Sequence, residues 1–204
     1  MLGYSWKRCR LSLKNKRNQD LFDKQQVELE QLVELHKSGY IDLYYGDASH
    51  FGLTPCVPYA WQHKDKPKLL PAAKGKSLSV FGLMTPCCKL YSQSFEGTLN
   101  SDAVIGILDE FVKTITKRTV AVIDNAPIHR SHKFMEKIQE WKEKDLLIYF
   151  LPPYSPELNK IEILWRFIKY QWLPFEAYHN FTKLKEQLDL VLNQVGSKYV
   201  INFY

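Results

Sequence analysis

The stretch that most constrains the fold of this chain is TVAVIDNAPIH, at residues 119–129. The four apolar residues at 120–123 follow one another without polar alternation, which is typical of a strand buried on both faces inside a parallel sheet. Asp124 and Asn125 end this run, and Pro127 prevents further strand pairing. Open α/β sheets place their ligands at the carboxyl ends of such strands, so Asp124 is a candidate site residue. The alternative interpretation is that Asp124 and Asn125 only form an Asx turn.

The composition excludes several classes of protein. The 204 residues suffice for one domain with a complete core, and 45% hydrophobic and 25% charged residues are ordinary for a globular protein. No apolar run is long enough for a membrane span or a signal peptide, so we expect a cytoplasmic protein. The four cysteines form no C-x-x-C pair, which favours reduced thiols over a disulfide framework. The net charge of +6 moderately favours a polyanionic partner.

Basic residues concentrate at the N-terminus, where residues 1–20 contain a single acid, Asp20. The six basic residues of this segment are Lys7, Arg8, Arg10, Lys14, Lys16 and Arg17. Such an arm commonly contacts nucleic acid, and a solvated tail is an equally good interpretation. We therefore divide the chain into a basic arm or linker at 1–19, a linking helix at 20–39, and a main domain with C-terminal helices at 40–204.

Hydrophobic periodicity and turn signals predict the elements of the rest of the chain. In chain order they are a helix over 20–37, a strand over 41–45, a short strand near 59–62, a hairpin of strands 77–85 and 89–95, a helix from 101, the strand 120–123, a helix over 131–144, a strand over 146–151, and helices over 158–172 and 181–195. Two continuous apolar strands joined by a helix form a βαβ unit with parallel strands. The whole order predicts a mixed α/β sheet, an antiparallel meander plus parallel strands, flanked by helices as in the ribonuclease-H-like architecture.

Two further acids are candidate partners of Asp124. We expect Asp47 at or just beyond the end of strand 41–45, and Glu162 one turn into the helix that begins near residue 158. A simple alternative for Glu162 is an ion pair with Arg166, four residues on. Three carboxylates meeting at one point repel one another and raise their pKa values, and a hard divalent cation such as Mg²⁺ relieves this repulsion. Two such ions can hold the attacking and leaving oxygens of a phosphoryl displacement.

Three ordered blocks resemble the signatures of DDE-type transposases, on the bacterial insertion-sequence side of the Tc–mariner superfamily. The blocks are YYGDASHF at 44–51, DNAPIHRS at 124–131 and LPPYSPELNKIEILW at 151–165, within a match over about residues 40–175. The resemblance implies that Asp47, Asp124 and Glu162 are the catalytic, metal-binding acids of a ribonuclease-H-like catalytic domain. It also implies Mg²⁺ or Mn²⁺, with two ions expected, and cut-and-paste transposition. In such a reaction, as the resemblance implies, water would first cut the element's ends and the freed 3′-hydroxyl would then attack target DNA.

The sequence departs from the family's pattern at three points. Ala48 stands where many members have a second acid, and Lys160 replaces a usual proline. The 37 residues between Asp124 and Glu162 are a few more than is typical. This longer spacing leaves Glu157 as an alternative third acid, and we favour Glu162 because it matches the motif position.

The resemblance implies double-stranded DNA as the partner, both as transposon ends and as target, and we expect a homodimer on that DNA near the bacterial nucleoid. No compact basic three-helix unit precedes Asp47, so we expect sequence-specific recognition to require a separately encoded or frameshift-joined N-terminal domain. Lys160, Arg166 and Lys169 join the basic arm as candidate DNA contacts, with solvated surface positions as the alternative.

The other polar and aromatic residues of the motif blocks are expected to be structural. We expect Asn125 and His129 to brace their loop, and Trp165, Trp172 and Tyr154 to pack in the core or between helices. The functional alternatives are a truncated or inactive transposase product that binds DNA or partners and regulates transposition, and, less favoured, a hydrolase with two catalytic acids such as a glycosidase. The third acid and the basic arm count against the hydrolase.

Overall fold

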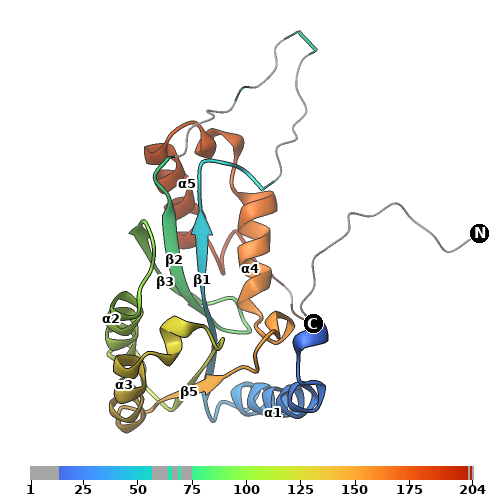
Figure 1. Cartoon of the computed structure of the whole chain (residues 1–204), viewed down its shortest axis with the longest axis vertical. Helices are drawn as coiled ribbons and strands as arrows, with labels where there is room; N and C mark the ends of the chain where they lie inside the picture. Colours follow the sequence, from blue (N-terminus) through green and yellow to red (C-terminus); the bar gives the residue numbers. More distant parts are fainter. Residues whose placement is uncertain (1–13, 57–63, 66–68, 70–74, 202, 204) are drawn as a thin grey trace, which may run out of the picture.

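The computed structural model of this protein describes residues 14–56, 64, 65, 69, 75–201 and 203. The strand expected near 59–62 and the arm residues Lys7, Arg8 and Arg10 lie outside the described residues. A five-stranded sheet with the strand order β3-β2-β1-β4-β5 forms the centre of the molecule (Figure 1). Its strands are β1 (Asp42–Phe51), β2 (Leu78–Met84), β3 (Leu90–Glu96), β4 (Thr119–Ile123) and β5 (Leu146–Phe150).

The sheet is mixed, as the sequence predicts. β1 pairs antiparallel with β2, and β2 with β3, which confirms the meander. On the other side, β1 pairs parallel with β4, and β4 with β5. The predicted βαβ unit is therefore confirmed, since β4 and β5 are joined by a helix and run in the same direction.

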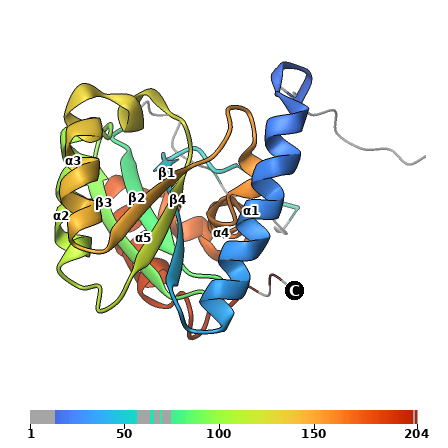
Figure 2. The same cartoon turned by 90° about the horizontal axis from the view of Figure 1, so that it is seen from below.

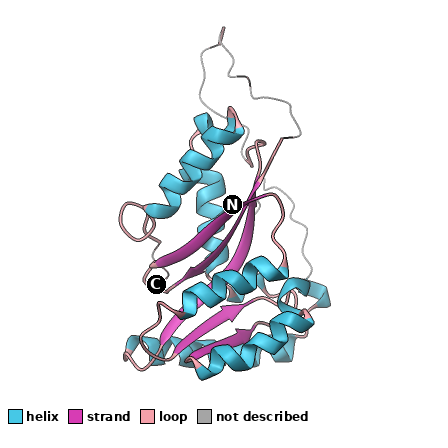
Figure 3. Ribbon diagram, turned by 90° about the vertical axis from the view of Figure 1, so that its left-hand side faces the viewer, coloured by secondary structure: helices cyan, strands magenta, loops and turns pink. Residues whose placement is uncertain are grey.

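In the part of the chain that the structure describes, α-helices cover both faces of this sheet (Figures 2 and 3). They are α1 (Gln19–Lys37), α2 (Ser101–Val112), α3 (His132–Glu143), α4 (Ile161–Phe167) and α5 (Phe181–Asn193). One hydrophobic core joins the sheet to α1, α4 and α5, and a second core joins its other face to α2 and α3. The strands serve both cores by alternation: Leu43 and Tyr45 of β1 belong to the first, and Tyr44 to the second. None of the described helices is long and apolar enough to cross a membrane.

Short polar residues fix where the helices begin and end. Asn18, Asn100, Ser131 and Asn180 are N-caps whose side chains each accept a hydrogen bond from the N–H group three residues on. Gly196 follows α5 with a φ angle of +84°, a left-handed conformation that glycine adopts without strain. The predicted boundaries of α1, α3 and α5, and the predicted start of α2, are confirmed within one or two residues.

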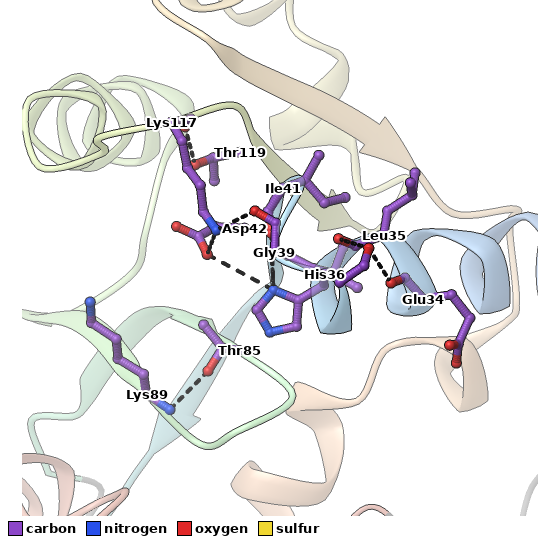
Figure 4. A network of polar contacts seen from close by, with 12 residues as sticks. Glu34, Leu35, His36, Gly39, Ile41, Asp42, Thr85, Lys89, Lys117 and Thr119 are labelled. Carbon is purple, nitrogen blue, oxygen red and sulfur yellow. Dashed lines mark hydrogen bonds and ion pairs between the residues drawn. The ribbon is translucent and has the colours of Figure 1, made fainter.

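Polar contacts fasten α1 to the beginning of β1, at the end of the sheet far from the predicted site (Figure 4). Nδ1 of His36 lies 3.9 Å from Oδ1 of Asp42, and the Leu43 N–H group donates to Nδ1 of His36 over 3.3 Å. Nζ of Lys117 lies 3.2 Å from Oδ1 of Asp42 and donates to the Gly39 carbonyl over 3.1 Å. These contacts hold the end of α1 against the sheet at the point where β1 and β4 both begin.

Two predicted boundaries are wrong. The strand expected over 41–45 continues to Phe51, because its pairing with β2 runs from Tyr45 to Phe51 after its pairing with β4 ends at Gly46. The helix expected over 158–172 begins only at Ile161, after a 3₁₀ turn, η3 (Pro156–Leu158), and an extended Asn159. Leu158 therefore belongs to the turn before the helix rather than to the helix itself. At its other end, α4 continues as a π-helical turn, η4 (Ile168–Trp172).

Candidate active site

The register of the parallel strands places Asp47 and Asp124 at the same level of the sheet. Gly46 of β1 and Ile123 of β4 form the last parallel pair. Asp47 is the next residue of β1, and Asp124 is the residue that follows β4. Side chains alternate along strands, so Asp47 and Asp124 extend to the face of Tyr45 and Val122, which is the face covered by α4. Asp47 is thus not at a strand end, as the sequence suggested, but at the end of the parallel pairing.

Trp165 of α4 fixes the position of the Asp47 carboxylate. Asp47 is paired with Gly82 of β2, and a Cβ atom at Gly82 would lie only 2.9 Å from Cη2 of Trp165. Glycine at this position therefore lets the indole ring lie directly on the strand. From there the indole Nε1–H donates a hydrogen bond of 3.1 Å to Oδ2 of Asp47.

Asp124 is braced by its own loop. Its Oδ1 accepts a hydrogen bond of 3.1 Å from the Ala126 N–H group, so the Asx turn that was the alternative interpretation of this residue is present. The same oxygen lies 2.8 Å from Nδ1 of His129, which is only 1% exposed, and Nδ1 lies 3.3 Å from the Asp124 carbonyl. These contacts agree with the bracing role expected for His129. They orient the Asp124 carboxylate, which therefore stays a candidate site residue.

Glu162 enters the site from the first turn of α4, not one full turn into a helix. Its N–H group donates to the Asn159 carbonyl over 3.1 Å, while the buried Asn159 side chain donates from Nδ2 to the Gly46 carbonyl over 3.0 Å. Asn159 therefore ties the beginning of α4 to the residue that precedes Asp47. Glu162 and Asp124 line the same cavity, of about 480 Å³.

The three carboxyl groups act on one another electrostatically. Burial, followed by the charges of Glu162 and Asp124, raises the pKa of Asp47 to about 8, against the opposing hydrogen bonds of Ala48 and Trp165. Burial also raises the pKa of Glu162, with Lys169 opposing and Asp124 adding to the shift. At Asp124 burial is outweighed by the hydrogen bond and charge of His129, so its pKa lies below the ordinary value.

Glu157 and Arg166, the alternatives considered for the third acid and for a Glu162 ion pair, lie apart from this arrangement. Glu157 is exposed and its Oε2 lies 3.6 Å from Nη1 of Arg17, on the side of α1. Lys169, not Arg166, is the cation that acts on Glu162. The surroundings of the two glutamates therefore favour Glu162 as the third acid.

The side chains that form this site are hard oxygen donors, which suit Mg²⁺ or Mn²⁺ better than zinc. Burial, with neighbouring carboxylates adding to it, raises the pKa values of Asp47 and Glu162, and a bound divalent cation would favour their charged forms. Among the described residues, however, no three His, Cys, Asp or Glu side chains are close enough to hold one ion together. The donor set fits a hard divalent ion, provided that side chains or bound phosphate complete the coordination.

The candidate DNA-contacting residues are scattered over the surface that the structure describes. Lys16 is exposed, and the guanidinium of Arg17 lies 3.9 Å above the Phe22 ring. Lys160 lies 5.8 Å from the ring centre of Tyr45, and burial lowers its pKa. Lys14 lies in the 3₁₀ turn before α1, and Arg166 is exposed on α4. Lys169 is a member of this group whose charge opposes the rise in the pKa of Glu162.

Two residues of the site are not evident from the sequence, and one expectation is wrong. Asn159 and Gly82 act through a tertiary hydrogen bond and a close approach of a ring, which no local pattern encodes; the position of Asn159 inside a motif block is the only signal. Trp165 is buried, as expected, and Trp172 stacks on Phe167 with ring centres 5.2 Å apart. Tyr154, which was expected to pack, is instead 47% exposed and lines the cavity.

The solved structures that match this chain include several of one transposase. The chain matches the structure described as "Mos1 transposase paired-end complex with left transposon end" with a TM-score of 0.65 and 17% identity, over 94% of this chain and 60% of that chain. It matches the "Mos1 mariner paired end complex with Mn" with a TM-score of 0.60 and 16% identity, over 94% and 60% of the two chains. The catalytic domain of Mos1 mariner transposase matches with a TM-score of 0.56 and 14% identity, over 92% and 85%. The chain spans about 60% of the transposase chain in the two complexes, and at these identities the similarity establishes the fold.

The strand order, the mixed pairing and the helices on both faces define a ribonuclease-H-like protein of the kind found in transposase catalytic cores. The model of the DDE superfamily endonucleases matches residues 42–185, from the first residue of β1 into α5. The chain therefore belongs to the DDE superfamily endonuclease family. No curated protein gave a match to the sequence.

Proposed function

We propose that this chain is the catalytic domain of a transposase that cuts DNA at transposon ends and joins the freed strand to target DNA. Asp47, Asp124 and Glu162 are its catalytic acids. The observation that carries this proposal is the placement of two acids at one level of the sheet, with the third entering from the helix that covers that face. Membership of the DDE endonuclease family supports the same reaction class.

Asp47, Asp124 and Glu162 would hold Mg²⁺ or Mn²⁺, two ions in the complete site. When bound, such ions activate the attacking oxygen and stabilise the leaving oxygen of a phosphoryl transfer. The protein's own residues orient the acids for this task. Trp165 contacts Oδ2 of Asp47, and His129 and the Ala126 N–H group contact Oδ1 of Asp124. The second carboxylate oxygen of each aspartate makes none of these contacts.

Double-stranded DNA is the proposed substrate, both as transposon ends and as target. The titles of the related structures name a transposon end and a paired-end complex for Mos1 transposase, and the shared fold extends this substrate to the present chain as a proposal. Two copies acting together on DNA, with a separately encoded or frameshift-joined recognition domain, complete the proposed assembly. The net charge of +6 is consistent with a polyanionic partner.

The decisive experiment is strand cleavage of DNA that carries the terminal repeats of the element encoding this chain, with and without Mg²⁺. We expect nicking that requires Mg²⁺ or Mn²⁺ and that disappears in Asp124→Ala. Glu157→Ala is the matched control, because it removes an exposed glutamate that pairs with Arg17. Binding of DNA without any cleavage by the wild-type protein, under conditions in which a partner polypeptide is also supplied, would instead support a non-catalytic regulator of transposition.

A further inference from the structure

Tyr154 has a backbone conformation that its residue type disfavours. Its φ angle is +59°, in the left-handed region where side chains other than those of Gly, Asn and Asp are uncommon. It lies between Pro153 and Ser155, two residues upstream of Pro156, so the chain is locally restricted. Such strain persists only where the surrounding structure enforces it, and it is frequent at ligand-binding positions.

Packing does not account for this strain. Tyr154 belongs to neither hydrophobic core, and 47% of its surface is exposed. Its hydroxyl group has no hydrogen-bond partner within the part of the chain that the structure describes. A strained backbone that presents an exposed aromatic ring indicates a ligand-binding surface.

The ring lies on the wall of the cavity that contains Asp124 and Glu162. The wall of this cavity has two chemically different parts. One part consists of the carboxylates of Asp124 and Glu162. The rest is largely apolar and includes Leu151, Pro152 and Pro153. Its volume of about 480 Å³ falls within the range of roughly 300–1,000 Å³ typical of small-molecule sites.

We propose that Tyr154 is a stacking platform for the nucleobase next to the phosphate that the acids position. This inference rests on the proposed function, because it assigns the apolar part of the same cavity to the base of the same nucleotide substrate. Aromatic side chains stack on any base, since every base has a π-face, so the contact holds DNA without reading its sequence. Tyr154 is therefore a substrate-contacting residue and takes no part in proton or metal chemistry.

The test uses the full chain and a forked DNA of arbitrary sequence, with 2-aminopurine in the single-stranded arm next to the fork. Ca²⁺ replaces Mg²⁺ so that binding is measured without cleavage. The wild-type protein should quench the fluorescence of 2-aminopurine, and Tyr154→Phe should preserve this quenching. Tyr154→Ala should abolish the quenching and weaken binding roughly ten-fold. Tyr170→Ala is the matched control, because Tyr170 is 50% exposed on η4 and does not line the cavity.

Thermal unfolding separates stacking from a structural role. Tyr154→Gly should unfold at a higher temperature than Tyr154→Ala, because glycine relieves the left-handed strain, yet it should bind the forked DNA as weakly. The proposal is overturned if wild-type protein leaves 2-aminopurine unquenched, or if Tyr154→Ala quenches as well as wild type. Cleavage is a separate readout: quenching by a protein that does not cut DNA with Mg²⁺ refutes the proposed activity and leaves the base-stacking site standing.

Discussion

Trp165 and Asp47 are joined by a hydrogen bond of 3.1 Å from the indole Nε1–H to the carboxylate Oδ2. The contact links α4, which also carries Glu162, to β1, which carries Asp47. It occupies one of the two carboxylate oxygens of Asp47, and the Ala48 backbone also donates a hydrogen bond to this carboxylate. The indole reaches this position only because Gly82, the β2 partner of Asp47, has no side chain.

Removing this hydrogen bond should impair cleavage more than folding. Trp165→Phe keeps an aromatic ring over Gly82 but loses the donor, so Asp47 is no longer held in one orientation. A hydrogen bond to a charged group contributes roughly 1.5–3 kcal/mol, so we expect cleavage to slow by about ten-fold or more. The measurement is the single-turnover nicking rate in Mg²⁺, together with Mn²⁺ affinity by calorimetry. Trp141→Phe is the matched control, since it removes a 2.8 Å indole bond to Asp109 on the other face of the sheet. Equal rates in the two variants would contradict the assignment.

Each of the three acids should be essential to cleavage and dispensable for folding. Asp47→Ala, Asp124→Ala and Glu162→Ala should each abolish nicking. For Asp47 and Glu162 the change removes a carboxyl group whose charged form is disfavoured by burial and by the neighbouring acids, so metal-free stability above about pH 8 should hold or rise. Asp124→Ala should be the least stable of the three, because it loses the contacts to His129 and Ala126. Nicking assays and denaturant unfolding test both statements. Wild-type nicking by Glu162→Ala, with loss in Glu157→Ala, would show that the third acid is Glu157.

The metal-free protein should become less stable as the pH rises from about 4 to about 8. The Asp47 carboxyl, with a pKa raised to about 8, keeps its proton in the folded state, whereas the unfolded chain loses it near pH 4. The folded state therefore binds more protons across this window, and the free energy of unfolding falls with pH, by a few kcal/mol at most. Urea unfolding in EDTA at about pH 5 and about pH 8 measures this slope. Asp47→Asn should flatten it, and an unchanged slope in that variant would refute the role given to Asp47.

Asn159 should matter for cleavage beyond its contribution to stability. Asn159→Ala removes the 3.0 Å bond to the Gly46 carbonyl and should cost roughly 1–2 kcal/mol of unfolding free energy. It should also release the beginning of α4 and so displace Glu162. Asn180→Ala is the matched control, because losing the N-cap of α5 costs a similar amount, typically about 1 kcal/mol, away from the site. If nicking falls equally in both variants, Asn159 acts through stability alone.

The basic arm should supply affinity for DNA without sequence preference. We expect the chain to bind terminal-repeat and scrambled duplexes about equally, because lysine and arginine contacts to phosphate carry no sequence information. Truncation should stop at residue 13, since Asn18 caps α1 and Arg17 contacts Glu157 and Phe22. Loss of residues 1–13 should weaken binding and flatten its salt dependence in a gel-shift assay. Strong preference of the intact chain for the terminal repeat would contradict this expectation.

The central strands, the hairpin and the helix caps follow from local pattern, and most of them could be predicted. The apolar run of β4 has no polar position because both faces of this strand are covered by helices. β1 was predicted too short because Asp47, Ser49 and His50 resemble a loop. Its second half is a strand because β2 supplies hydrogen bonds to it, and that pairing joins segments about 30 residues apart.

The details of the candidate site were the least predictable. The start of α4 depends on Asn159, whose side chain binds the Gly46 carbonyl 113 residues away in sequence. The left-handed conformation of Tyr154 is likewise set by its surroundings, because tyrosine has no intrinsic preference for it. The motif blocks of the sequence predict the three acids, whereas tertiary contacts decide how each of them is held.

The candidate site depends on the number of residues in β1 before Asp47. Side chains on a strand alternate between faces, so a shift of β1 by one residue would move Asp47 from the α4 face to the face of α2 and α3. The pairs from Tyr45–Met84 to Phe51–Leu78 prevent such a shift in the intact protein. Insertion or deletion of a single residue between Asp42 and Asp47 should therefore inactivate the enzyme even where the sheet still forms. Natural or engineered variants of this chain can change length at the loops, but not along this strand.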